Sequence, residues 1–436
     1  MKKLLIYTHD LVCNGSNKHL IRILPHLLKV YEVILVINLE AESEKLIKHL
    51  PKQAKNFKIL FLENTSFISP LKQLVKIIKQ YQPVYVLSLR NEANFVALLS
   101  KRLIIGLTKS GLATCPKYVC LVQQHFSKQF KYARTVKERL FLKTLLRLYK
   151  SADLIVSASE GLAIDLNNLI PRLINKIKPV YNAGFDGDYA KLEVASVGDR
   201  WFNEKSKQLV GNSKRSKKIN SGKKFVLPEF NFQPAAPVPI IISCCNLKEH
   251  KNLELLIQAF SIVVKKQPAR LVLLGIPAIP LLTSVVEQKD LSAAKISKLE
   301  LEYIVKLSGL ISQLKLEQSV KVLPFQNNPY KFFSKSDIFV LPSLYEGFAT
   351  VLVEAMSAKC PVIACNCQSS PNEIIEDNKS GFLIAVNNVN ELAQNILLLL
   401  TRPELQQKFR EEGFLRSQKF SAENSVAGLI KLLDKL

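Results

Sequence analysis

Two glutamates of this chain have the residue type and the spacing for chemistry on a sugar nucleotide. Glu346 stands in a loop after a predicted strand, and Glu354 stands eight positions later inside a predicted helix. A helix N-terminus carries unpaired N–H groups and a partial positive charge, so it is suited to bind phosphate. A carboxylate on each side of it can accept hydrogen bonds from hydroxyl groups. The pattern therefore predicts a site for ribose, diphosphate and sugar in a row.

The sequence around these glutamates resembles the donor-binding core of retaining glycosyltransferases of the GT-B type, family 4. The family has two glutamates with seven residues between them, and the resemblance covers residues 319–384. The segments that carry it are FQNNPYKFFSKSDIFVLPSLYEGF, VLVEAM, PVIACNC, NEII and GFLI. The spacing alone occurs often by chance, and the alternative is that both glutamates are solvated acids.

The resemblance implies an α/β fold of two doubly wound Rossmann-like domains that face each other across a cleft. It assigns the sugar to Glu346 and the ribose to Glu354, and it implies retention of configuration without a tightly bound metal or other cofactor. We expect the diphosphate to meet backbone N–H groups at the start of the helix. The residues concerned are Gly347, Phe348, Ala349 and Thr350.

The same resemblance implies an arginine and a lysine that stabilise the leaving diphosphate. The segment ISCCNLKEHKN places Lys251 at the lysine position, but Asn246 at the arginine position. An arginine offers phosphate a charged fork, whereas asparagine offers a neutral amide. The loss of one charged hydrogen bond lowers the stabilisation by about 1.5–3 kcal/mol. Either Lys248 compensates, or the chain is a weak or inactive GT-B protein that binds nucleotide-sugar or serves in a glycosylation complex. The alternative for Lys251 is a surface lysine at a helix start.

Three further residues receive roles from the resemblance. Gly15, in the turn Asn14-Gly15-Ser16, would let the backbone approach the donor, and it is otherwise an ordinary turn glycine. His125 follows a predicted strand and would contact the donor sugar, unless it is a structural histidine. Phe325 would flank the base or else fill the core.

Length and periodicity predict two α/β domains. A chain of 436 residues exceeds one ordinary core. Short apolar segments alternate with amphipathic ones, which is typical of parallel sheets covered on both faces. The expected strands are Lys3–Tyr7, Glu32–Ile37, Lys58–Leu62, Val84–Leu89, Tyr118–Gln123, Leu154–Ala158, Lys176–Tyr181, Pro239–Ser243, Leu271–Gly275, Val320–Leu323, Asp337–Leu341 and Pro361–Cys365.

The domain boundaries follow from the linker YNAGFD and from the stretch after it. We expect a first domain at residues 1–187, a linker with a basic insertion at 188–235, and the nucleotide-sugar domain at 236–418. The helix at 419–436 is expected to cross back to the first domain, as the resemblance implies.

The net charge of +25 points to an acidic partner. Residues 205–224 contain eight Lys or Arg and no acid, and are expected to form a basic surface loop. Residues 137–150 form a basic amphipathic helix, which either lies on an anionic membrane or packs its apolar face on its own sheet. Nucleic acid is not expected, because no aromatic residues are interleaved with the basic run.

Eight cysteines without a C-x-x-C pair, and an N-terminus MKKLLIYTHD without a signal-peptide core, predict reduced thiols in a cytoplasmic protein. With the basic helix, this protein would be peripheral on the inner face of the membrane. The segments FQNNPY and NEII resemble enzymes that build surface polysaccharides or lipid-linked oligosaccharides, often from UDP-sugars. We therefore expect a nucleotide-diphosphate sugar as donor and a glycan or a lipid-linked molecule as acceptor.

Overall fold

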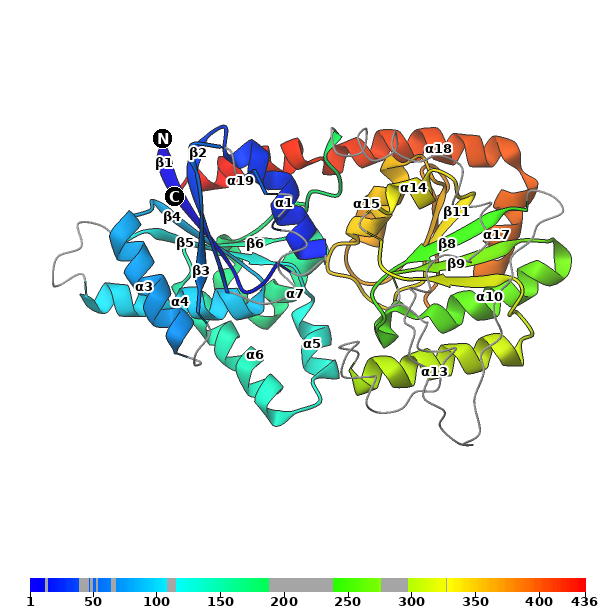
Figure 1. The fold of residues 1–436 in the computed structure, drawn as a ribbon, viewed down its shortest axis with the longest axis horizontal. Helices are drawn as coiled ribbons and strands as arrows, with labels where there is room; N and C mark the ends of the chain where they lie inside the picture. Colours follow the sequence, from blue (N-terminus) through cyan, green and yellow to red (C-terminus); the bar gives the residue numbers. More distant parts are fainter. Residues whose placement is uncertain are drawn as a thin grey trace, which may run out of the picture.

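The structure, a computed structural model, describes residues 1–11, 15–38, 47, 50–51, 54–63, 68–107, 115–187, 238–275, 297–326 and 328–436. It consists of two α/β domains side by side (Figure 1). Each domain has a parallel sheet with helices on both faces, as the alternation of strands and helices predicts. The basic loop predicted at 205–224 lies outside the described residues, and so does the whole of the predicted linker at 188–235.

In the first domain the described strands form a seven-stranded parallel sheet in the order β3-β2-β1-β4-β5-β6-β7. Strand order reverses between β1 and β4, where Leu4 pairs with both Val33 and Tyr85. Ligands bind at such switch points, beyond the carboxyl ends of the strands. The strands are β1 (Lys2–Thr8), β2 (Tyr31–Asn38), β3 (Phe57–Leu62), β4 (Tyr85–Leu89), β5 (Lys117–Val122), β6 (Leu154–Ser157) and β7 (Ile177–Pro179).

In the second domain the described strands form a six-stranded parallel sheet in the order β10-β9-β8-β11-β12-β13. Its switch point lies between β8 and β11, where Ile338 pairs with Ile241. The strands are β8 (Ile240–Cys244), β9 (Arg270–Leu274), β10 (Val320–Leu323), β11 (Ile338–Leu341), β12 (Val362–Cys365) and β13 (Phe382–Ile384).

The helices cover both sheets (Figure 1). Those of the first domain are α1 (Gly15–Leu27), α3 (Ser69–Tyr81), α4 (Asn91–Leu107), α5 (Phe126–Tyr132), α6 (Val136–Leu148) and α7 (Glu160–Leu169). The described helices that follow the first domain in sequence are α10 (Leu253–Lys266), α13 (Lys298–Gln313), α14 (Tyr330–Phe333), α15 (Thr350–Ser357), α16 (Pro371–Ile374), α17 (Val389–Thr401), α18 (Pro403–Ser417) and α19 (Ala422–Leu433).

The last helix, α19, packs on the first domain beside α1 (Figure 1). Val426, Leu429 and Leu433 are buried in the same hydrophobic core as β1 and β2. The hydroxyl of Tyr85 donates a hydrogen bond to the carbonyl of Leu433, at 3.0 Å. The chain therefore returns to the first domain after it has completed the second.

Several element boundaries differ from those predicted. The strand predicted at Glu32–Ile37 is one residue longer at each end, because Tyr31 and Asn38 also pair with neighbouring strands. The strand β13 was not predicted, because GFLI is too short to show a period. Helix α13 begins at Lys298, where the side chain of Ser297 accepts a hydrogen bond from the N–H of Glu300.

The seven described cysteines form no disulfide, and four of them are buried. Within the described residues, the structure contains no helix that is both long enough and apolar enough to span a membrane.

Candidate functional site

Several of the predicted site residues lie where the two domains meet. Lys251 follows β8 and Glu346 follows β11, so both lie at the switch point of the second sheet. Gly15 opens α1, directly across the boundary from Thr350, which opens α15: a Cβ built on Gly15 would lie 3.4 Å from Thr350 Oγ1. Two helices from different domains thus begin at the same place.

Glu346 is buried and paired with Lys251. Lys251 Nζ lies 2.6 Å from Glu346 Oε1, and the Ser343 hydroxyl donates to the same oxygen at 2.7 Å. Burial alone would raise the pKa of Glu346, but the charge and the hydrogen bond of Lys251 outweigh it and hold this pKa below its usual range. In turn, Glu346 raises the pKa of Lys251 despite its burial. Both groups are therefore charged near neutral pH, and neither is a solvated surface residue.

Glu354 is also buried, and its partners come from the other domain. Arg22 donates a short hydrogen bond to Glu354 Oε1, and Lys18 Nζ lies 3.2 Å from the same oxygen. Burial would raise the pKa of Glu354, but these two cations lower it. Lys18 and Arg22 were not among the predicted site residues. Their signal was present in SNKHLIRIL, where two cations four positions apart share one helix face without an acid nearby.

The loop before α15 is held close to the first domain. A Cβ on Gly347 would lie 2.1 Å from the carbonyl oxygen of Gln123, so only glycine fits here. The N–H of Ala349 donates to Ser370 Oγ at 2.9 Å, and the N–H of Thr350 donates to the carbonyl of Phe348. Two of the four N–H groups predicted to face a diphosphate are thus already hydrogen-bonded within the protein.

Phe348 itself belongs to the hydrophobic core, with its ring 6.0 Å from Tyr181 and 5.7 Å from Phe420. This aromatic cluster joins the end of the first domain, the α15 loop and the segment that leads into α19. A donor would therefore meet the backbone of Phe348 and not its ring.

His125 lies at the carboxyl end of β5 and is the N-cap residue of α5. Its Nδ1 is 3.0 Å from Asp165 Oδ2 on α7. Asp165 also accepts hydrogen bonds from Ser127, and these contacts together outweigh burial and lower the pKa of Asp165. The ring of His125 thus lies beside a carboxylate of its own domain.

Asn246 and Phe325 are exposed. Asn246 lies at the carboxyl end of β8, where its carbonyl accepts a hydrogen bond from the N–H of Lys248 at 2.9 Å. Phe325 follows β10 and is 38% exposed, which excludes the alternative that it fills the core.

Three stacked rings cross the boundary beside the Glu346–Lys251 pair. The ring of Tyr132 on α5 stacks on Tyr345 at 5.5 Å, and Tyr345 stacks on His250 at 4.6 Å. Burial lowers the pKa of His250 to about 4. Since Tyr345 precedes Glu346 and His250 precedes Lys251, the stack fixes the backbone of both charged residues against the first domain.

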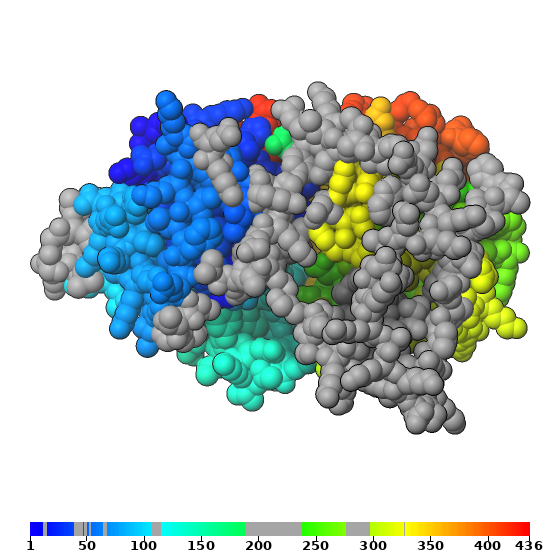
Figure 2. Space-filling model, viewed as in Figure 1, coloured from blue at the N-terminus to red at the C-terminus, as the bar shows by residue number. Residues whose placement is uncertain are grey.

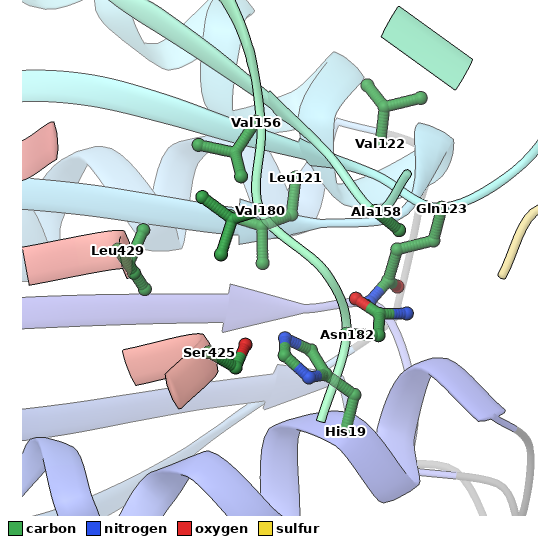
Figure 3. Close-up of a pocket in the computed structure, with 10 residues that line it drawn as sticks. All are labelled: His19, Leu121, Val122, Gln123, Val156, Ala158, Val180, Asn182, Ser425 and Leu429. Carbon is green, nitrogen blue, oxygen red and sulfur yellow. The ribbon is translucent and has the colours of Figure 1, made fainter. Parts of the chain in front are cut away.

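A small cavity with a mostly apolar lining lies on the first-domain side of the boundary (Figure 3). The side chains of His19, Gln123, Asn182 and Ser425 approach it from four different segments. Its volume of about 10 Å³ holds about one water molecule and no sugar. This cavity is therefore too small for a nucleotide-sugar.

Comparisons of the sequence and of the structure with known proteins both find glycosyltransferases. Residues 229–416 match the family model of the glycosyl transferases group 1. The chain is 24% identical over 450 residues to the N-acetylgalactosamine-N,N'-diacetylbacillosaminyl-diphospho-undecaprenol 4-alpha-N-acetylgalactosaminyltransferase of Campylobacter jejuni, which covers 99% of this chain and 100% of that relative. It is 31% identical over 132 residues to the poly(ribitol-phosphate) alpha-N-acetylglucosaminyltransferase of Staphylococcus aureus, which covers 30% of this chain and 26% of the relative.

Among solved structures, HepE of Anabaena in complex with UDP and glucose has a TM-score of 0.71 at 17% identity and covers 100% of both chains. This likeness concerns the fold, and it confirms the predicted arrangement of two Rossmann-like domains. Residues 229–416 thus resemble the glycosyl transferases group 1, and the chain as a whole has the GT-B fold of its structural neighbours.

Proposed function

We propose that the protein is a retaining family 4 glycosyltransferase that moves a sugar from a nucleotide-diphosphate sugar to a lipid-linked or glycan acceptor. The observation that carries the proposal is the pair of buried, ionised glutamates on the two sides of the α15 N-terminus. Each is held by a cation, and the two domains meet at this point. A diphosphate fits between them because helix N-termini and fixed cations stabilise negative charge.

In the proposed mechanism, Glu346 and Ser343 orient the sugar hydroxyls while Lys251 lies near the leaving diphosphate. Glu354 accepts ribose hydroxyls, and the N-terminus of α15 faces the phosphates. Charge grows on the diphosphate as the glycosidic bond breaks, so fixed positive groups favour the transition state. His125, oriented by Asp165, approaches the sugar from the first domain. Contact between the domains excludes water, which limits hydrolysis of the donor.

UDP-sugars are the favoured donors, and the acceptor class follows from the relatives. HepE was solved with UDP and glucose, and the relative from Campylobacter jejuni is named for a sugar carried on diphospho-undecaprenol. The relative from Staphylococcus aureus is named for a polymer acceptor. These names support a role in surface polysaccharide or glycoconjugate synthesis. No metal or other cofactor is part of the proposal.

Association with an anionic membrane surface is part of the same proposal. The apolar face of α6 is buried in its own domain through Leu142, Leu145 and Leu148. Its opposite face exposes Arg139, Lys143 and Arg147. The part of the chain that contains α6 lies at the lower edge of the first domain (Figure 2). Each such cation near an anionic surface contributes about 1 kcal/mol. A Lys143→Gln/Arg147→Gln variant should sediment less with anionic vesicles than the wild type, and unchanged sedimentation would contradict this part.

The test of the main proposal is a donor screen with a matched turnover assay. UDP-, GDP- and ADP-sugars are compared by thermal shift, where ligand at a hundred times its dissociation constant stabilises the fold by about 2.7 kcal/mol. Donors that bind are then offered with undecaprenyl-diphosphate-linked acceptors, and the anomeric linkage of the product is read by NMR. An absence of stabilisation by every donor would refute the proposal, and an inverted linkage would refute retention.

A second candidate is a GT-B protein that binds nucleotide-sugar with weak or no turnover. The specific observation in its favour is Asn246, a neutral residue where the resemblance implies arginine. Donor binding without turnover, together with turnover gained by Asn246→Arg, would favour this candidate.

A further inference from the structure

We propose that Lys18 of the first domain supplies the second cation for the leaving diphosphate, which residue 246 does not supply. This inference rests on the function proposed above and concerns the same site. The cation would reach the diphosphate from the opposite domain, so the positive charge of the site would be complete only when the domains are in contact.

Among its described residues, the second domain brings little net positive charge to the site. Lys251 is its buried cation, and this charge is balanced by Glu346 at 2.6 Å. Asn246 is neutral, and Lys248 is exposed to solvent. A diphosphate between the domains therefore needs a further cation.

The first domain brings two cations to this place. The side chains of Lys18 and Arg22 both approach Glu354. Arg22 is 7% exposed and also donates to the carbonyl of Ala183 and the hydroxyl of Tyr330, each at 3.2 Å. These contacts tie Arg22 to the framework, so it is suited to hold Glu354 in place.

Lys18 is the cation that can turn toward a ligand. Its side chain is 22% exposed, and a lysine ammonium on a flexible stem can exchange one anion for another without moving the backbone. It lies three residues after Gly15, and a Cβ on Gly15 would contact Thr350 at the start of α15. Lys18 is thus within one helical turn of the place where α1 and α15 begin.

A buried hydroxyl independently marks this place as a ligand site. Thr350 is 5% exposed, and its Oγ1 finds no hydrogen-bond partner among the described residues. This oxygen faces Gly15, where the missing side chain leaves space. A buried hydroxyl without a partner is costly, and a phosphate oxygen would accept its hydrogen bond.

The test combines charge removal, charge conservation and charge transfer. Lys18→Met removes the cation and keeps the length of the side chain, Lys18→Arg keeps the charge, and Lys18→Met/Asn246→Arg moves a cation to the other domain. Lys76→Met on the exposed face of α3 is the matched control. For each variant, calorimetry measures the affinity for UDP and for uridine, thermal unfolding measures the melting temperature without ligand, and an activity assay measures donor turnover. If the wild type prefers another nucleotide, GDP and guanosine or ADP and adenosine replace UDP and uridine.

Lys18→Met should bind UDP about 10- to 100-fold more weakly and bind uridine as the wild type does, because one charged contact to phosphate is lost. Its kcat should fall by a similar factor. Lys18→Arg should stay within a few-fold of the wild type, and the double variant should recover UDP affinity.

Three results would overturn the inference. Equal weakening of UDP and uridine with a lower melting temperature would make Lys18 a structural residue only. Unchanged UDP affinity in Lys18→Met, with donor turnover intact, would refute the inference and leave the proposed function standing. No binding of any nucleoside diphosphate by the wild type would refute both.

Discussion

Individual side chains determine the charge of this site, because both of its carboxylates are buried and each depends on a cation. Glu346 depends on Lys251 within the second domain, whereas Glu354 depends on Lys18 and Arg22 across the boundary. Removal of one partner from a buried pair leaves an uncompensated charge, which costs about 3–5 kcal/mol. The same residues that serve the donor therefore also stabilise the fold.

Lys251→Met should abolish turnover and lower the free energy of unfolding by up to about 3–5 kcal/mol, because Glu346 is left buried without its cation. The pKa of Glu346 is lowered in the folded state, so its contribution to stability is present above the unfolded pKa and is lost as the pH falls through the folded pKa. In urea unfolding, Lys251→Met/Glu346→Gln should recover part of the stability and none of the activity. Full activity of Lys251→Met would contradict the role of this lysine.

Two buried histidines should make the protein less stable on mild acidification. Burial lowers the pKa of His19 to about 3 and that of His250 to about 4. Below pH 6.5 the unfolded chain binds protons that the folded chain excludes, so stability should fall between pH 6.5 and 5, by up to about 1.4 kcal/mol per pH unit for each histidine. His19→Asn and His250→Asn should each flatten the slope measured by urea unfolding. An unchanged slope in both variants would contradict the prediction.

Helices and loops position the site through close backbone approach. The loop before α15 touches the carbonyl of Gln123 at Gly347, α1 meets α15 at Gly15, and a Cβ on Gly184 would lie 2.3 Å from the Val353 side chain. These approaches leave no room for a Cβ at residues 347 and 184. Small residues at the boundary therefore decide how near the two helix N-termini can come.

Gly347→Ala should open the boundary, because its Cβ would lie 2.1 Å from a backbone oxygen that cannot move alone. We expect a large loss of turnover and a larger radius of gyration by small-angle X-ray scattering. Gly309→Ala is the control, since a Cβ there meets no atom within 4 Å, and alanine in a helix is favoured by up to about 1 kcal/mol. A fully active Gly347→Ala protein of unchanged size would show that the close contact is not needed.

For the whole molecule, the return of the chain through α18 and α19 makes the two domains one unit. Leu429 and Leu433 are buried in the core of the first domain, although they follow the entire second domain in sequence. The rings of Tyr181, Phe348 and Phe420 pack together where the chain crosses. The domains can move relative to each other only as far as this connection allows.

Leu429→Ala should destabilise the protein by about 2–5 kcal/mol, the usual cost of a cavity at a buried leucine. Leu415→Ala on α18 is the matched control: this leucine is 62% exposed, and its replacement should change the free energy of unfolding by less than about 0.5 kcal/mol. Denaturant unfolding of both variants checks this. Equal effects at the two leucines would contradict the packing of α19 on the first domain.

The sequence determined the parts of this protein that depend on neighbours along the chain. The periodicity of apolar residues predicted two parallel α/β domains, because buried strands and amphipathic helices each show their pattern within a short run of consecutive residues. The block around Glu346 and Glu354 predicted the donor domain, since loop, helix start and strand follow one another there. The three-residue strand β13 was not predicted, because it is too short to show a period of apolar residues.

Only the tertiary structure decided which groups complete the site. Lys18 and Glu354 are 336 residues apart in sequence, and no local pattern relates them. The same holds for Gly347 beside Gln123 and for the stack of Tyr132, Tyr345 and His250. The physical reason is that charge pairing and close packing act between surfaces of two separately formed domains, and their partners exist only once those surfaces meet.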